Sequence, residues 1–213
     1  MSDPQEAKAS LRTEAGFALR ELGHELTSHD VHDELLTEIA QVARALRERV
    51  AEGPPRSRGN IDGFLSAGSD NESRKGLFPD SIVSGSDNPM GINAKMSRDG
   101  DDAVLIATLR SAHQGAPGRA HGGIVAALFD EAMGLVLSMI NTVAFTGWLK
   151  VSYRAPTPLH EPLEVRARML SKDGRKISME AEMTSSDGAL IAEATSLFIE
   201  VDLEAFLGTR NNS

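Results

Sequence analysis

Two features of the segment 118–131 could carry out chemistry together. Gly122 and Gly123 stand where a long apolar helix is predicted to begin, and Asp130 lies within the same helix. The first backbone N–H groups of a helix are unpaired and carry a partial positive charge, and glycine lets a ligand come close to them. Such a helix start can stabilise an oxyanion that forms during a reaction. A carboxylate among apolar side chains is poorly solvated, which makes Asp130 a candidate general base or nucleophile.

The distance between these two features decides how they can meet. Asp130 follows His121 by nine residues (130 − 121), which is about 13.5 Å along a helix that rises 1.5 Å per residue. Asp130 therefore cannot reach a carbonyl group that is bound at the start of its own helix. The two features can act together only if a second copy of the helix lies alongside, antiparallel. The spacing thus predicts at least a homodimer with shared active sites, and it leaves a tetramer open.

The helix that carries these residues is predicted over 121–140. Between residues 122 and 140 the only strongly polar side chains are those of Asp130, Glu131 and Ser138. A segment of this length could span a bilayer, but each of the two adjacent acids would cost about 2–3 kcal/mol in lipid. We therefore predict no transmembrane segment, but a helix that protein buries on nearly all sides.

Short strands are predicted on both sides of this helix. Two precede it (90–97 and 103–109) and four follow it (144–154, 163–170, 176–185 and 190–201). Asp173-Gly174 and Asp187-Gly188 are strong signals for hairpin turns between the later strands. The order β-β-α-β-β-β-β predicts an α+β fold in which an antiparallel sheet curls around one apolar helix.

The first fifty residues are predicted to be helical. From Asp30 to Val50 apolar residues recur on one helix face, with Asp33 as the N-cap, and Gly53 with the two prolines after it ends the helix. The next stretch is rich in Gly, Ser, Pro, Asn and Asp. We therefore divide the chain into an N-terminal helical extension and linker (1–75), a sheet-and-helix domain (76–205) and a tail (206–213).

Composition excludes several classes of function. The formal net charge of −9 disfavours a nucleic-acid partner, and the absence of cysteine excludes disulfides, thiolate metal sites and a cysteine nucleophile. The spacing of His24, His29 and His32 matches no standard ligand set, so no metal site is predicted. The polar, acidic start MSDPQEAKAS has no features of a secretory signal, and we expect a cytoplasmic location.

The motif around the helix start resembles a known family. His121-Gly122-Gly123 followed by an acid nine residues after the histidine resembles the PaaI-like branch of the hotdog-fold thioesterases. The resemblance covers about residues 78–202 and includes the loop 115–118 and the strand 153–159. It is closest to the thioesterases that resemble carboxyl-terminal modulator protein, in which a threonine sixteen residues after the acid assists catalysis. Thr146 holds that position here (146 − 130).

The resemblance implies a hotdog fold and an acyl-CoA thioesterase of lipid metabolism, with no cofactor because CoA is part of the substrate. It implies Asp130, Gly122, Gly123, Thr146 and His121 as the catalytic residues. Other side chains could contact the thioester or the CoA phosphates. These are Gln114 and His113 before the glycine-rich loop, Trp148 as a pocket wall, and the cations Arg119, Arg154, Arg175 and Lys176.

The same residues also allow structural roles without catalysis. His121 could simply bond to the backbone, Asp130 could be a structural acid paired with an arginine, and Glu131, about 100° around the helix axis, is expected to make a structural hydrogen bond. Two further classes of function remain open. One is a hotdog dehydratase or hydratase, which needs a His–acid pair across subunits. The other is a non-catalytic module that binds acyl-CoA.

Overall fold

The computed structural model describes residues 4–56 and 78–201 of the 213 residues. The predicted boundary at 75/76 and the predicted tail 206–213 lie outside the described residues. The elements, in chain order, are the helices α1 (Pro4–Ser28) and α2 (Asp33–Ala51), the strands β1 (Lys95–Asp99) and β2 (Asp102–Thr108), the short 3-10 helix η1 (Ser111–His113), the helix α5 (Gly122–Met139), and the strands β3 (Ala144–Tyr153), β4 (Pro162–Asp173), β5 (Lys176–Ser185) and β6 (Leu190–Glu200). The predicted order of strands and central helix is confirmed.

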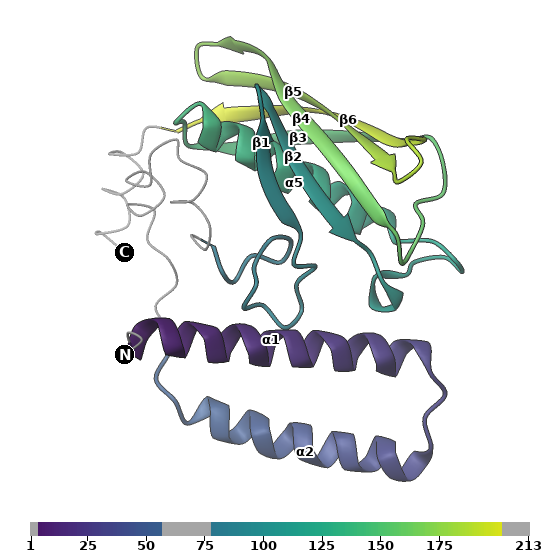
Figure 1. Ribbon diagram of the computed structural model, residues 1–213. Helices are drawn as coiled ribbons and strands as arrows, with labels where there is room; N and C mark the ends of the chain where they lie inside the picture. The colour runs from purple at the N-terminus through teal and green to yellow at the C-terminus, as the bar shows by residue number, and fades with distance from the viewer. Residues whose placement is uncertain (1–3, 57–77, 202–213) are drawn as a thin grey trace.

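The strands form one antiparallel sheet in the order β1-β2-β4-β5-β6-β3. The central helix α5 lies against one face of this sheet, and the strands curve around it (Figure 1). Both predicted hairpin turns are present, with Gly174 (φ +54°) and Gly188 (φ +84°) in the left-handed region that glycine adopts without strain. The strand β3 forms one edge of the sheet in the described part of the chain.

The core lies between α5 and the inner face of the sheet. Residues alternate along each strand, and the inward set is fully or almost fully buried. Leu105, Val165, Met179 and Met183 contribute from the sheet and Phe129 from the helix, each with no exposed surface. This packing fixes the axial position of α5, and with it the places of both candidate features.

The expected burial of α5 on nearly all sides is wrong for the single chain. Only one face of the helix is covered by the sheet, half of its residues remain partly accessible, and Asp130 is exposed. The apolar composition predicted the burial, but composition does not say on which side the sheet ends. By length and apolar content alone this helix could cross a membrane. These two properties are weak evidence for a membrane span, because a helix packed in a protein core has them too.

The first strand begins later than predicted, at Lys95 instead of residue 90. Asn93 has a φ of +58°, a left-handed conformation that a regular strand cannot contain. The preceding segment forms irregular backbone pairs instead, such as Ala94 N–H with the carbonyl of Val83 at 2.8 Å.

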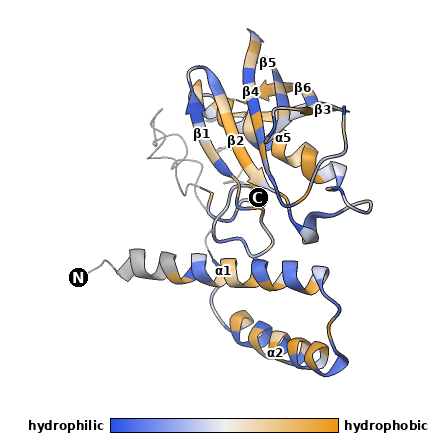
Figure 2. Cartoon of the chain, turned by 45° about the vertical axis from the view of Figure 1, so that its right-hand side comes forward, coloured by the Kyte–Doolittle hydropathy of each residue, from blue (hydrophilic) through white to orange (hydrophobic). Residues whose placement is uncertain are grey.

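The N-terminal region forms two antiparallel helices, of which α1 lies between α2 and the sheet domain (Figures 1 and 2). The predicted N-cap is wrong, because His32 has the extended conformation of a cap and Asp33 is already the first helical residue. None of the residues of α2 is buried, and its predicted apolar stripe is exposed, with Val42 and Leu46 each about half accessible. In contrast, Arg20 of α1 is only 7% exposed.

Candidate active site

The start of α5 is organised by His121, which is the N-cap residue of the helix. Its Nδ1 accepts the N–H of Gly123 at 2.9 Å, and its own N–H donates to the carbonyl of His113 at 2.9 Å. The predicted backbone bond of His121 is therefore present. Gly122 N–H, by contrast, has no acceptor among the described residues. A single unpaired donor thus stands at the positive end of the helix.

Tyr153, at the end of β3, holds the other side of the Gly122 peptide. Its hydroxyl donates to the carbonyl oxygen of Gly122 at 2.7 Å. A Cβ atom built on Gly122 would lie 3.1 Å from that hydroxyl, so a larger residue would push the tyrosine away. The sequence did not predict this role of Tyr153. The two residues are 31 positions apart, and no periodic pattern connects them.

Asp130 and Thr146 are in direct contact. The hydroxyl of Thr146 on β3 donates to Oδ1 of Asp130 at 2.7 Å. Directly after this threonine the pairing of β3 with β6 shifts by one residue, which leaves Gly147 as the extra residue of a β-bulge. A bulge turns the side chains beside it relative to a regular strand. The structure therefore brings together the acid and the threonine on which the family resemblance depends.

The unpaired Gly122 N–H and the Asp130 carboxylate do not meet within one chain. They are separated by eight residues of helix (130 − 122), which is about 12 Å. No arginine contacts Asp130 among the described residues, so the alternative of a structural acid with an arginine partner finds no support there. Within the described residues the carboxylate has one hydrogen-bond donor, Thr146, and Asp130 is exposed.

Glu131, beside Asp130, has the structural role that was predicted for it. It accepts hydrogen bonds from the hydroxyls of Ser81, at 2.9 Å, and Ser84. These bonds tie the irregular segment before β1 to the central helix. The two adjacent acids of α5 thus differ in role. Glu131 holds the segment before β1 through hydrogen bonds, and Asp130 is exposed.

Most of the predicted substrate-binding residues already have partners within the chain. His113 Nδ1 accepts the N–H of Arg110 at 3.0 Å, which accounts for this histidine without a substrate. Gln114 Oε1 accepts the N–H of Gly118 at 3.4 Å. Arg154 pairs with Glu193 at 2.5 Å, and Arg175 Nε donates to the carbonyl of Glu200 at 2.8 Å.

Two predicted cations keep free side chains in the described part of the chain. Arg119 lies on the loop just before Gly122, and Lys176 begins β5, and both are exposed. In the sheet register Lys176 is opposite Ile199, whose other neighbour is Phe145, next to Thr146. The structure therefore places Arg119 at the Gly122 end of α5 and Lys176 toward the Asp130 end, and does not bring them together in one chain.

Apolar side chains are exposed along the edge strand β3, where the candidate residues lie. Phe145, Trp148 and Tyr153 are each about half accessible. Trp148 is therefore not a core residue of the single chain.

Two cavities of about 270 and 300 Å³ lie against α1, and neither is lined by Asp130 or Gly122. No group of three or more His, Cys, Asp or Glu side chains suited to a metal occurs among the described residues.

Comparison with known proteins gives a consistent result. Residues 117–192 match the family model described as "Thioesterase superfamily". The acyl-coenzyme A thioesterase THEM4 of Mus musculus is 36% identical over 92 residues, which are 43% of this chain and 40% of that protein. The THEM4 protein of Bos taurus is 34% identical over 92 residues, 43% of this chain and 38% of that protein. The chain thus matches about two fifths of the length of these relatives.

A solved structure extends the likeness to the fold as a whole. The crystal structure of a thioesterase superfamily protein is similar over 88% of this chain and 94% of that chain, with a TM-score of 0.75 and 24% identity. Its similarity covers more of the chain than the family model does, and it supports the arrangement of sheet and central helix. The chain therefore has the hotdog fold, and residues 117–192 of it match the thioesterase superfamily model.

Proposed function

We propose that this chain hydrolyses an acyl-CoA thioester to a free acid and CoA. Two features of α5 carry the proposal. Its Asp130 accepts a hydrogen bond from Thr146 of β3, and its start offers the N–H of Gly122, which has no acceptor among the described residues. The match to the thioesterase superfamily and the names of the curated relatives support the same reaction.

In this proposal Gly122 N–H polarises the thioester carbonyl. As a nucleophile attacks, the carbonyl oxygen gains negative charge, and a fixed N–H at a helix start stabilises it. Loss of one such donor costs about 10²–10³-fold in rate in other enzymes. Gly123 N–H is held by the His121 ring, so Gly122 is the donor left for the substrate.

Asp130 supplies the second half of the reaction. It either removes a proton from an attacking water or attacks the carbonyl carbon itself, and both routes need the ionised carboxylate. In both, the bond from carbon to sulfur breaks, a bond from carbon to oxygen forms, and the thiolate of CoA takes up a proton. In the second route the acyl group is first attached to Asp130 as an anhydride, and a water then hydrolyses it to the free acid and restores the carboxylate. The hydroxyl of Thr146 would hold the carboxylate in position through its 2.7 Å hydrogen bond.

We further propose that two chains share each site, in a homodimer. The gap of about 12 Å along α5 can be closed only by the Asp130 of a second copy. The strand β3 supports this arrangement, because it is the last strand of the described sheet and its exposed Phe145 and Trp148 stand next to the site. The same pairing would bring Arg119 of one chain toward Lys176 of the other, as two cations for the CoA phosphates.

A dehydratase or hydratase is less well supported by the geometry. That chemistry needs a His–acid pair, whereas His121 caps the helix through Nδ1 and contacts no acid among the described residues. The test measures the release of free thiol from a panel of acyl-CoAs that differ in chain length and include aromatic acyl groups. The same assay is run with acylated acyl carrier protein. Thiol release supports hydrolysis. A change in absorbance of the α,β double bond without thiol marks a lyase, and binding without either product marks a non-catalytic module.

A further inference from the structure

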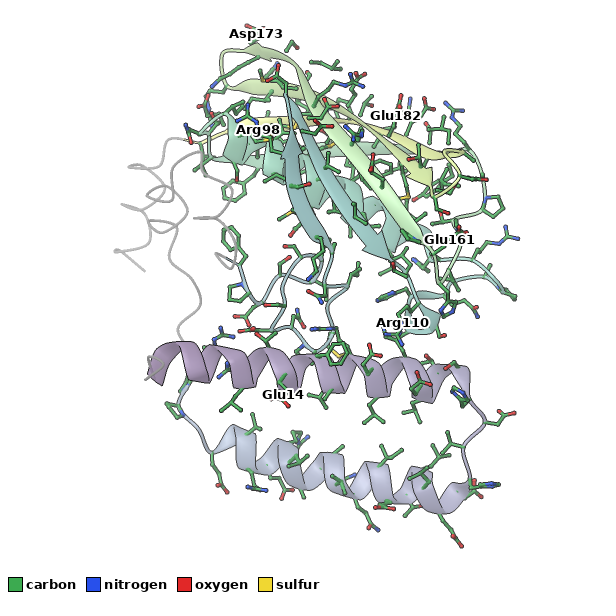
Figure 3. The ribbon with its side chains drawn as sticks, viewed as in Figure 1. Glu14, Arg98, Arg110, Glu161, Asp173 and Glu182 are labelled. Carbon is green, nitrogen blue, oxygen red and sulfur yellow. The ribbon has the colours of Figure 1, made fainter. Side chains whose placement is uncertain are left out.

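The first N-terminal helix reaches the loop that leads into the active site. His24 of α1 is only 7% exposed, and its Nδ1 accepts the N–H of Ala112 at 3.2 Å. Ala112 lies in the middle of η1, the short 3-10 helix that precedes the glycine-rich loop. Figure 3 shows Arg110, at the start of this turn, directly above α1.

This contact satisfies a donor that has no other acceptor among the described residues. Within η1, His113 N–H donates to the carbonyl of Arg110 at 2.8 Å and Gln114 N–H to that of Ser111 at 3.1 Å. Ala112 N–H is one of the first N–H groups of the turn, which the turn itself cannot pair. Its acceptor comes from a residue 88 positions earlier in the chain.

From η1 the contacts continue to the start of α5. The ring of His113 packs edge-on against the ring of His24, with centroids 4.9 Å apart. The carbonyl of His113 accepts the N–H of His121 at 2.9 Å, and the ring of His121 caps Gly123. The residue between these two anchored positions is Gly122, whose N–H is the proposed oxyanion donor.

Ion pairs also connect α1 to Arg110, the residue just before η1. Arg110 pairs with Glu21 of α1 and lies 3.7 Å from Glu25. Burial lowers the pKa of His24, as does the charge of Arg110, which favours the neutral ring that can accept a hydrogen bond at Nδ1.

We infer that His24 is a positioning residue for the Gly122 N–H, and that α1 is therefore part of the scaffold of the active site. The inference rests on the proposed thioesterase function. An oxyanion donor is effective only when it is fixed within a fraction of an ångström, and the bonds within η1 leave Ala112 N–H without an acceptor. His24 supplies the missing bond from outside the turn.

The test compares three full-length variants in the thiol-release assay. His24→Leu removes the acceptor, and His24→Asn keeps an oxygen where Nδ1 was. Thr13→Val removes the bond of 2.7 Å between Thr13 and Asp87, which docks the other end of α1 far from η1. We expect kcat of His24→Leu to fall about tenfold with KM changed less than threefold. We expect both His24→Asn and Thr13→Val to keep kcat within twofold of wild type.

Thermal midpoints of the same variants separate positioning from stability. If His24→Leu and Thr13→Val lower the midpoint alike and neither changes kcat at 25 °C, His24 is only structural and the inference is overturned. If His24→Leu does not fold, His24→Gln replaces it, since its longer side chain cannot place an oxygen at the Nδ1 position. Normal kcat in a folded His24→Gln then overturns the inference, and a reduced kcat supports it.

Wild type and Asp130→Asn in the same assay separate this inference from the proposed function. If wild type releases no thiol, or if Asp130→Asn is as active as wild type, the proposed function fails. If wild type is active, Asp130→Asn is inactive and His24→Leu is normal, only the role of His24 fails.

Discussion

Thr146 and Asp130 are joined by a hydrogen bond of 2.7 Å, in which the threonine hydroxyl donates to the carboxylate. One residue lies on the edge strand β3 and the other on the exposed face of α5. The bond leaves one carboxylate oxygen for a water or a substrate. It also links the central helix to the sheet edge at which a second subunit is proposed to bind.

Removing the Thr146 hydroxyl should slow the reaction less than removing the charge of Asp130. We expect Thr146→Val, which keeps the branched shape, to lower kcat about 10–100-fold, because a hydrogen bond to a charged group contributes about 1.5–3 kcal/mol. Thr146→Ser keeps the hydroxyl and should stay within a few-fold of wild type. An unimpaired Thr146→Val enzyme, measured by thiol release, would remove Thr146 from the site.

The hydroxyl of Tyr153 should matter through the Gly122 peptide that it holds. We expect Tyr153→Phe to lower kcat about 2–10-fold, since a neutral hydrogen bond contributes about 0.5–1.5 kcal/mol, while the thermal midpoint changes little because the ring is exposed. The measurement is steady-state kinetics with the best acyl-CoA of the panel. Equal kcat for Tyr153→Phe and wild type would show that the Gly122 peptide keeps its place without this bond.

The contact between α1 and η1 should make stability depend on pH. Burial, with the nearby charges of His24 and Arg110, lowers the pKa of His113 to about 4 from 6.5. The unfolded chain therefore takes up the proton first, and the free energy of unfolding should fall as pH falls from about 6.5 to about 4, by on the order of 3 kcal/mol. His24, whose pKa is also lowered, adds to the same trend.

Urea unfolding between pH 4 and 8 measures this dependence. His113→Asn keeps an acceptor for Arg110 N–H but does not titrate, so its stability should depend less on pH than that of wild type. Identical profiles for His113→Asn and wild type would contradict the assignment of the dependence to this ring. The hydrogen bond from Arg110 lowers the pKa of Glu21, and this ion pair is the same in both proteins.

Mixing inactive subunits tests whether sites are shared. We expect Asp130→Asn and Gly122→Pro chains, unfolded and refolded together, to recover part of the wild-type activity. Each mixed dimer would contain one site with both changes and one with neither. Proline is tolerated at the first position of a helix, and it removes the N–H. If mixed dimers form, as shown by mass, but stay inactive, the shared site is excluded.

The structure supplies a matched control for the proline. Any Cβ at Gly122 lies 3.1 Å from the Tyr153 hydroxyl, so part of the effect of Gly122→Pro could be steric. Gly122→Ala has the same Cβ and keeps the N–H. We expect Gly122→Ala to be clearly more active than Gly122→Pro, and both parents must show a cooperative melt for the mixing result to be interpreted.

The sequence predicted the parts of this fold that depend on local pattern. The apolar run of α5, the alternation of β4 and β5, and the turns at Gly174 and Gly188 each follow from rules that act within a few residues. The pairing of Asp130 with Thr146 was predicted through the family resemblance, because spacing alone does not show which strand lies beside the helix.

Contacts between distant segments could not be predicted in this way. Tyr153 with Gly122, and His24 with Ala112, join residues 31 and 88 positions apart, and neither leaves a periodic signal. The exposure of Asp130 was missed for a related reason. A count of apolar neighbours along a helix does not reveal which face the sheet leaves open.

The central claim is that the Asp130 carboxylate drives hydrolysis of an acyl-CoA, and Asp130→Asn tests it most directly. The change keeps size and shape but abolishes the negative charge that a base or nucleophile needs. We predict that thiol release falls by about 10²–10⁴-fold while the melting curve stays close to that of wild type. Hydrolysis by a folded Asp130→Asn variant within a few-fold of wild type would contradict the account.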